Sequence, residues 1–140
     1  DLVPHSGAPS AQAEVALRQF VLASDTAYQR PDEALDDVEN YATEAMVNEV
    51  SSAVIELQWH SMRQRGRVTV GKVDVRSAAP TSVELAACLN AAGVAVVDKS
   101  GADLRGGQRP AARSLHYYTV DLVEGSWKVS SHSFPNDPDC

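Results

Sequence analysis

Two histidines, His116 and His132, are the side chains whose type and spacing could carry chemistry in this chain. They lie in two strand-like segments, and pairing of these segments as a hairpin around Gly125 would place the histidines roughly opposite each other. Imidazole titrates near neutral pH, so such a pair could transfer a proton or bind a metal ion. Two ligands make a poor metal site, and we expect neither a metal nor a cofactor. The alternative interpretation is that both histidines are structural strand residues with satisfied hydrogen bonds and no catalytic role.

The alternation along residues 115–122 predicts the direction in which these side chains point. Leu115, Tyr117 and Thr119 alternate with a more apolar set, which we expect to face the interior: His116, Tyr118, Val120 and Leu122. Asp121 then falls on the outer face.

The two cysteines, Cys88 and Cys140, are far apart in sequence and lack the spacing of a zinc or thioredoxin-type pair. We expect a disulfide that ties the carboxyl-terminal tail to the domain and contributes about 4 kcal/mol in the chain-entropy model. A disulfide indicates an oxidising compartment, so we expect an extracellular or cell-envelope location. A buried thiol at Cys88 with an unpaired Cys140 is the alternative.

The overall charge and the distribution of apolar residues exclude two classes of partner. The 140 residues carry a formal net charge of -7, which argues against nucleic acid. No apolar run reaches the roughly 18 residues that a membrane span needs. Residues 1–9 contain two prolines and a glycine without periodicity, as in a tether or a processed end, and a lipid anchor upstream would lie outside this sequence. We expect a flexible tether over 1–9, a single domain over 10–134 and a tail over 135–140.

Helical spacing dominates the first half of the domain. Ser10 has the type of an N-cap, and apolar residues then recur at intervals of three and four until Pro31 ends the helix. A short second helix is expected over 31–41, and a third over 43–62 that Gly66 terminates. The third helix would turn an apolar face to the core, formed by Met46, Val47, Val50, Val54, Ile55, Leu57, Trp59 and Met62.

The apolar period changes to two after Gly66. Valines alternate over 68–70 and again over 73–75, one residue out of phase, and this slip around Gly71 predicts a β-bulge. Further strands are expected over 82–90, 94–98, 112–123 and, after a hairpin at Gly125, 127–131. The fold class is therefore α+β, with amino-terminal helices packed in a strongly curved antiparallel sheet.

Several local patterns follow one another in a recognisable order: Tyr28 shortly before Pro31, the strand over 66–75, Cys88 followed by Asn90, Asp98 with Gly101, the segment 117–122, and Gly125-Ser126-Trp127-Lys128-Val129. Together they resemble the nuclear-transport-factor-2-like superfamily, also described as a cystatin-like α+β cone, in which a curved sheet wraps around helices. The resemblance covers residues 10–134. Within the superfamily, the chain most resembles a secreted or lipoprotein branch in actinobacteria.

This resemblance implies a range of functions, because the superfamily contains isomerases, dehydratases and cyclases as well as binding and assembly modules. An isomerase-type member would need an acid or base inside the cone and a hydrogen-bond donor opposite it to stabilise an enolate. The candidates are Tyr28, Asp74, His116, Tyr118, Asp121 and His132. Of these, Asp74 and Asp121 are expected on the outside, and Tyr28 is expected to close one end of the core.

Three functions remain open at this point. The first is a non-catalytic exported or envelope-associated domain that binds a protein or a small apolar ligand, with Tyr28 and Tyr118 as ligand-binding side chains. The second is a small isomerase or cyclase that uses His116, Tyr118 and His132 in the cone pocket. The third is a homodimeric assembly module. We favour the first, because the sequence contains no nucleophile motif, metal-ligand spacing or phosphate loop.

Overall fold

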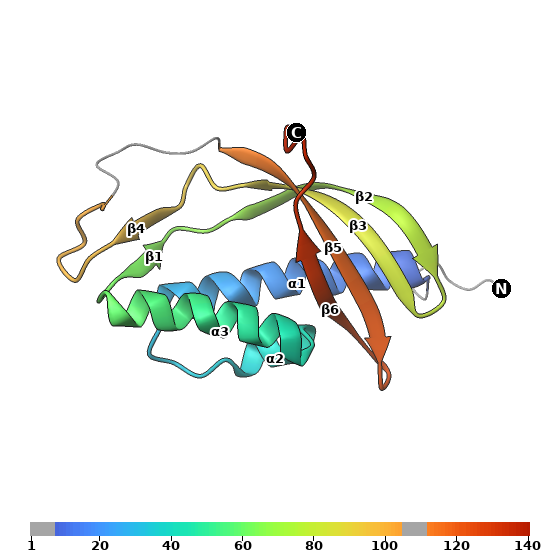
Figure 1. Ribbon diagram of the computed structural model, residues 1–140, viewed down its shortest axis with the longest axis horizontal. Coiled ribbons are helices and arrows are strands. Elements are labelled where there is room, and N and C mark those ends of the chain that lie inside the picture. Colours follow the sequence, from blue (N-terminus) through green and yellow to red (C-terminus); the bar gives the residue numbers. More distant parts are fainter. Residues whose placement is uncertain (1–7, 105–111) are drawn as a thin grey trace.

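The computed structural model describes residues 8–104 and 112–140, so most of the expected tether over 1–9 lies outside the described residues. Within these residues, three helices precede the strands (Figure 1). The helices are α1 (Pro9–Gln29), α2 (Asp36–Tyr41) and α3 (Glu44–Trp59). The strands are β1 (Arg63–Arg65), β2 (Thr69–Ala79), β3 (Ser82–Asn90), β4 (Ala95–Val97), β5 (Arg113–Val123) and β6 (Ser126–Ser133). This is the α+β class expected from the sequence.

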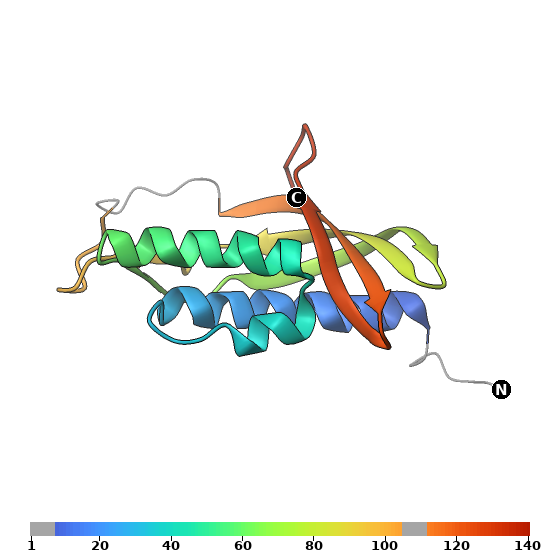
Figure 2. The same cartoon turned by 60° about the horizontal axis from the view of Figure 1, so that its bottom comes forward.

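The main sheet has four antiparallel strands in the order β2-β3-β5-β6, and β1 pairs with β4 in a separate two-stranded ladder. The sheet curls over α1, and the β5–β6 hairpin crosses that helix (Figure 1). A second view places α3 alongside α1, with α2 next to β6 (Figure 2). Among the described residues, no helix is long and apolar enough to cross a membrane.

The expected bulge at Gly71 is present. The pairing of β2 with β3 changes register between Val70 and Val73, and again between Val75 and Ser77. A Cβ atom at Gly71 would lie 3.3 Å from the carbonyl oxygen of Cys88, so glycine suits this close approach. Such bulges bend a strand and increase its twist, which accounts for the curvature of the sheet at this edge.

The interior of the curved sheet is filled by side chains from the helices and from the inner strand faces. Phe20 of α1 packs edge-to-face against Tyr118 of β5, with ring centroids 6.4 Å apart. The largest fully buried side chains are Leu17, Val38, Val50, Val83, Leu85, Val97, Val120 and Val129. Burial of each such side chain contributes about 1.5–3 kcal/mol, so these layers dominate the stability of the fold.

The expected helix boundaries are partly wrong. The first helix begins at Pro9 with Ala8 as N-cap, not at a Ser10 cap, because proline at the first helical position lacks only an N–H group that would be unpaired there anyway. The second helix begins at Asp36, five residues later than expected. The third ends at Trp59, and it exposes 58% of Ile55 and 82% of Trp59, which were expected in the core.

Gly66 has a different role from the expected helix terminator. Its φ is +84°, and a Cβ atom there would lie 1.9 Å from the carbonyl oxygen of Gly93. Two backbone segments therefore cross at this glycine, just after the short strand β1, which the sequence did not predict. β1 consists of Arg63, Gln64 and Arg65, so it lacks the apolar alternation that reveals a strand.

Candidate functional site

Four side chains from three elements form one hydrogen-bonded series at the open end of the β5–β6 hairpin. Ser114 Oγ lies 2.8 Å from His116 Nε2, and His116 Nδ1 lies 2.8 Å from His132 Nε2. His132 Nδ1 in turn lies 3.2 Å from Glu49 Oε2. β5 supplies Ser114 and His116, β6 supplies His132, and α3 supplies Glu49. We call these four residues the Ser114–Glu49 relay.

One arrangement of protons satisfies every contact in the relay. The Ser114 hydroxyl donates to His116 Nε2, the His116 Nδ1–H donates to His132 Nε2, and the His132 Nδ1–H donates to Glu49. Both histidines are then neutral and carry their proton on Nδ1, an assignment that follows from the hydrogen-bond network. In this arrangement the hydrogen bonds run from the Ser114 hydroxyl to the Glu49 carboxylate.

The strand alternation explains why two relay residues share a face. Ser114, His116, Tyr118 and Val120 point toward the helices, as do their β3 partners Leu89, Ala87, Leu85 and Val83. The register of His132 differs from the expected one, because His132 pairs with Tyr118 and lies diagonally across from His116. The cause is a bulge in β6.

Ser130 is the extra residue of this bulge. Val129 pairs with Val120 and Ser131 pairs with Thr119, so Ser130 has no partner residue in β5. Its hydroxyl donates to the carbonyl oxygen of Thr119 at 3.2 Å. A bulge lets Val129 and His132, three residues apart, both face the interior, which a regular strand with a period of two does not allow.

Aromatic rings surround the histidine pair. The His132 ring stacks on Tyr118 with centroids 4.5 Å apart and on His116 at 5.1 Å. The Phe134 ring lies 4.9 Å from His116 and 4.7 Å from His132. Tyr118 is buried and Phe134 is 64% exposed, so the rings lead from the core to solvent.

Burial determines the charge state of the ring groups. It lowers the pKa of His116 to about 4, with a smaller contribution from the neighbouring His132, so His116 is neutral at neutral pH. Burial also raises the pKa of Tyr28 to about 12 and the pKa of Tyr118 well above its ordinary value. Both tyrosines are therefore neutral hydrogen-bonding groups under physiological conditions.

Within the described part of the chain, none of the remaining sequence candidates has a hydrogen bond to the relay, although the Glu49 carboxylate contributes to the raised pKa of Tyr28. Asp74 is exposed on the outer face of β2, with its carboxylate 3.8 Å from Lys72 Nζ. Asp121 lies on the outer face of β5, in register with Ser82 and Lys128. Tyr28 packs against the core from α1.

Sequence reasoning missed a buried carboxylate, Asp25 on α1, which is 3% exposed. Gln64 Nε2 donates to Asp25 Oδ1 at 2.7 Å, and the backbone N–H of Val68 donates to Asp25 Oδ2 at 3.0 Å. Burial nevertheless raises the pKa of Asp25, although both hydrogen bonds act in the opposite direction. These contacts tie α1 to the segment between β1 and β2. The only sign of this burial in the sequence was that Asp25 lies next to the residues of α1 that face the core.

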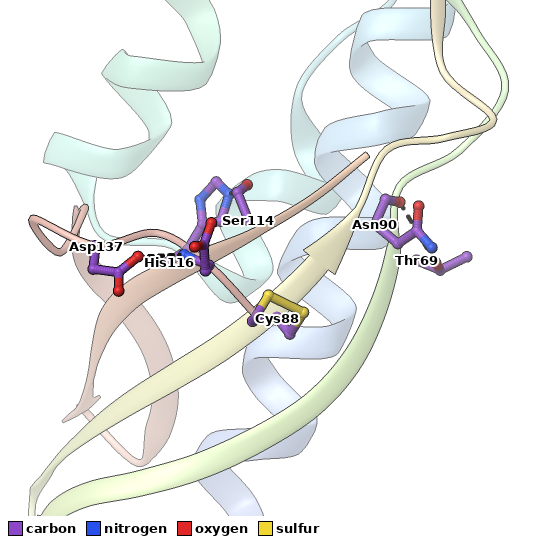
Figure 3. The surroundings of a disulfide bond; sticks show 8 residues. Thr69, Cys88, Asn90, Ser114, His116 and Asp137 are labelled. Atoms are coloured by element: carbon purple, nitrogen blue, oxygen red, sulfur yellow. Dashed lines mark hydrogen bonds between the residues drawn. A yellow bond between two sulfur atoms is a disulfide. The ribbon is translucent and has the colours of Figure 1, made fainter. Parts of the chain in front are cut away.

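The expected disulfide between Cys88 and Cys140 is present, with Cα atoms 5.8 Å apart. The backbone N–H of Leu115 also donates to the carbonyl oxygen of Pro138 at 2.7 Å. Both contacts hold the tail against the sheet. Figure 3 shows Cys88 between two groups of side chains, with Asn90 and Thr69 on one side and Ser114 and His116 on the other.

A groove of about 420 Å³ lies beside the disulfide on the sheet face that points away from the helices. Its apolar wall contains Leu115 and the disulfide, whereas Lys72 and Arg113 bring positive charge from β2 and β5. The full lining is Thr69, Gly71, Lys72, Asp74, Cys88, Asn90, Arg113, Leu115 and Cys140. Over residues 8–104 and 112–140, no group of three His, Cys, Asp or Glu side chains could hold a metal ion.

Comparison with known proteins finds similar folds among solved structures but no similar sequence. No protein-family model and no curated protein matches the sequence. Similar solved structures include the intermembrane space region of the chloroplast protein ARC6, with a TM-score of 0.63 and 16% identity over 86% of this chain and 92% of that one. A protein with a cystatin-like fold from Caulobacter vibrioides has a TM-score of 0.51 and 14% identity, over 91% and 90% of the two chains.

A third similar structure is an NTF-2 like protein of unknown function from Shewanella oneidensis. It has a TM-score of 0.50 and 10% identity, over 85% of this chain and 95% of that one. At such identities the comparisons establish a shared fold, and not a shared activity. The chain therefore has the nuclear-transport-factor-2-like, or cystatin-like, fold that its sequence pattern resembles.

Proposed function

We propose that this chain is an exported binding domain with a nuclear-transport-factor-2-like fold, whose ligand occupies the groove beside the disulfide. The observation that carries the proposal is that the concave side of the sheet is filled by side chains, whereas its outer side has an open groove. The concave side of the sheet is filled by Phe20, Leu85, Tyr118 and their neighbours, whereas the outer side has an open groove of about 420 Å³. A cavity of this volume falls in the usual range for small-molecule sites.

The chemistry of the groove favours a small apolar ligand with an anionic end. Leu115, Gly71 and the disulfide offer an apolar surface, which would contact the body of the ligand. Arg113 of β5 lines the groove and can bind a carboxylate, whereas Lys72 of β2 is already paired with Asp74 at 3.8 Å. A medium-chain fatty acid anion has both properties.

An oxidising compartment is the second part of the proposal. The Cys88–Cys140 disulfide forms one wall of the groove, so the site is complete only where the bond persists. Disulfides persist mainly in extracellular, periplasmic and comparable compartments, which favours export.

We prefer this function to an isomerase or cyclase that uses His116, Tyr118 and His132. Tyr118 packs against Phe20 and is 4% exposed, so its ring lies among core side chains and does not line an open pocket on the concave side of the sheet. The tyrosines that the sequence suggested as ligand-binding residues, Tyr28 and Tyr118, both lie on the helix side of the sheet. The groove residues therefore replace them in this proposal.

Calorimetric titration with decanoate tests the proposal. We expect saturable binding to the disulfide-bonded chain, and a loss of affinity of about tenfold or more in Arg113→Gln, because one charge-assisted contact is removed. Leu115→Glu should abolish binding by placing a negative charge in the apolar wall. Trp59→Gln, which removes an exposed apolar side chain of α3, is the matched control and should bind normally. Absence of saturable binding, or equal binding by Leu115→Glu, would refute the groove as the ligand site.

A further inference from the structure

The Ser114–Glu49 relay ends at a hydroxyl group that is only partly buried. We propose that Ser114 is a nucleophile activated by this relay, and that it accepts acyl groups from small carboxylic esters. The activity is separate from ligand binding in the groove, because Ser114 points to the helix side of β5 whereas Arg113 and Leu115 point to the groove.

The hydrogen-bond geometry carries the inference. A serine hydroxyl is a weak nucleophile until a base takes its proton, and His116 Nε2 is within 2.8 Å of Ser114 Oγ. A base of this kind needs a group that fixes its tautomer and stabilises its charged form. His132 Nε2 accepts from His116 Nδ1–H at 2.8 Å, and Glu49 places a carboxylate at the far end. A second imidazole and a glutamate thus occupy the place of the acid in a serine–histidine–acid triad.

The relay can also disperse the charge that develops on His116. When His116 Nε2 receives the serine proton, its Nδ1 proton can shift along the 2.8 Å hydrogen bond to His132 Nε2. His132 then carries the positive charge next to the carboxylate of Glu49. Burial lowers the pKa of His116 to about 4, so its Nε2 is unprotonated at neutral pH, and transfer of its Nδ1 proton to His132 would offset the weak basicity that this pKa implies.

The surroundings of Ser114 favour a small apolar acyl group. The exposed Phe134 ring lies 4.9 Å from the His116 ring and forms an apolar wall on the solvent side of the base. An acetyl or butyryl group could rest on this ring, whereas a large or charged acyl group would gain nothing from it. Short-chain esters are therefore the substrate class.

The reaction balances without a co-reactant other than water. Ser114 Oγ bonds to the ester carbonyl carbon, and its proton moves to His116 Nε2. The bond from that carbon to the alcohol or phenol oxygen then breaks, and the leaving group takes the proton from His116. Water attacks the acyl-serine and gives a proton to His116, which passes it to Ser114 Oγ as the carboxylic acid leaves.

The experiment combines p-nitrophenyl acetate with the intact, disulfide-bonded chain and follows p-nitrophenol release together with the mass of each peptide. We expect an acetyl group on Ser114, no such adduct in Ser114→Ala, and a rate at least about 100-fold lower in His116→Gln. Ser133→Ala removes a neighbouring exposed serine of β6 and should react like the parent chain. Acetylation confined to lysines, or a Ser114 rate unchanged in His116→Gln, would overturn the proposal.

Glu49 and His132 are positioning residues in this scheme, and a pH profile tests them. Glu49→Gln should lower the acylation rate and move the midpoint of its pH dependence to lower pH, because a negative charge next to the histidine pair is lost. An unchanged profile in this variant would exclude Glu49 from the relay. The groove variant Leu115→Glu should still acylate at Ser114, and Ser114→Ala should still bind decanoate, so either proposal can fail without the other.

Discussion

His132 is paired with Tyr118 across the β5–β6 ladder, and the extra residue Ser130 lies between this pair and the Val120–Val129 pair. The backbone carbonyl of Val129 also accepts from the N–H of Thr43 at 3.0 Å, so β6 is held from the helical side at this point. The bulge therefore lies between two inward-facing residues of β6, the apolar Val129 and the relay residue His132.

Deletion of one residue of β6 should be much less damaging at the bulge than beside it. Deletion of Ser130 removes the unpaired residue and leaves Val129 and His132 facing inward, so we expect a folded chain whose unfolding temperature falls only slightly. Deletion of Lys128 instead turns Val129 outward, and loss of a fully buried valine costs about 1.5–3 kcal/mol. Thermal unfolding of the two deletion variants measures the difference. Equal destabilisation would contradict the bulge assignment.

The stability of the fold should depend on pH through His116. Its folded-state pKa of about 4 lies below the ordinary value of 6.5, so the unfolded chain binds the proton more readily. The free energy of unfolding should therefore fall as the pH decreases from about 6.5 to about 4. After allowance for solvent screening, the loss is about 1–2 kcal/mol.

Urea unfolding of the parent chain and of His116→Gln at pH 7, 5 and 4 isolates this contribution, because the two proteins differ only in this side chain. The difference in stability between the two should shrink as the pH falls. A difference that stays constant over this range would argue against a neutral, buried imidazole.

Two glycines with the same backbone conformation provide a matched pair. Gly66 and Gly101 have φ values of +84° and +85°, so alanine is strained at either position by roughly 1–2 kcal/mol. A Cβ at Gly66 would also collide with the Gly93 carbonyl at 1.9 Å, whereas a Cβ at Gly101 meets nothing within 4 Å. We expect Gly66→Ala to lower the unfolding temperature far more than Gly101→Ala. Similar losses in both variants would show that the crossing at Gly93 is not tight.

Asp25 should act as a buried clamp between α1 and the segment after β1. Asp25→Asn replaces one carboxylate oxygen by an NH₂ group, which would face a donor from either Gln64 or Val68. A buried donor left without an acceptor costs about 1–3 kcal/mol. Chemical denaturation checks the value against Asp74→Asn, an exposed control expected to be neutral. Equal stability of the two variants would contradict the clamp.

The sequence predicted those features that leave a local pattern. The strand over 82–90 was predicted with the bounds that β3 has, and the phase slip of valines located the Gly71 bulge. The Ser130 bulge was not predicted, because the serine has ordinary strand chemistry and no glycine or phase slip marks it. β1 was missed for a similar reason, since its three residues are all polar.

The relay was only partly predictable. Alternation along β5 indicated that His116 and Tyr118 share a face, but it could not indicate Glu49, which reaches His132 from a helix 83 residues earlier. Ser114 was overlooked because a lone serine in a strand has no recognisable motif. Its contact with His116 depends on their separation by two residues, which places both on one strand face.

β5 is shared by the groove and the relay in alternating positions, with Arg113 and Leu115 on one face and Ser114 and His116 on the other. An insertion or deletion of one residue in this segment would exchange the two sets, and neither site would survive. Substitutions, in contrast, can change one face without moving the other. Residues on either face of β5 can therefore be substituted independently, whereas the number of residues in the strand must stay the same for both faces.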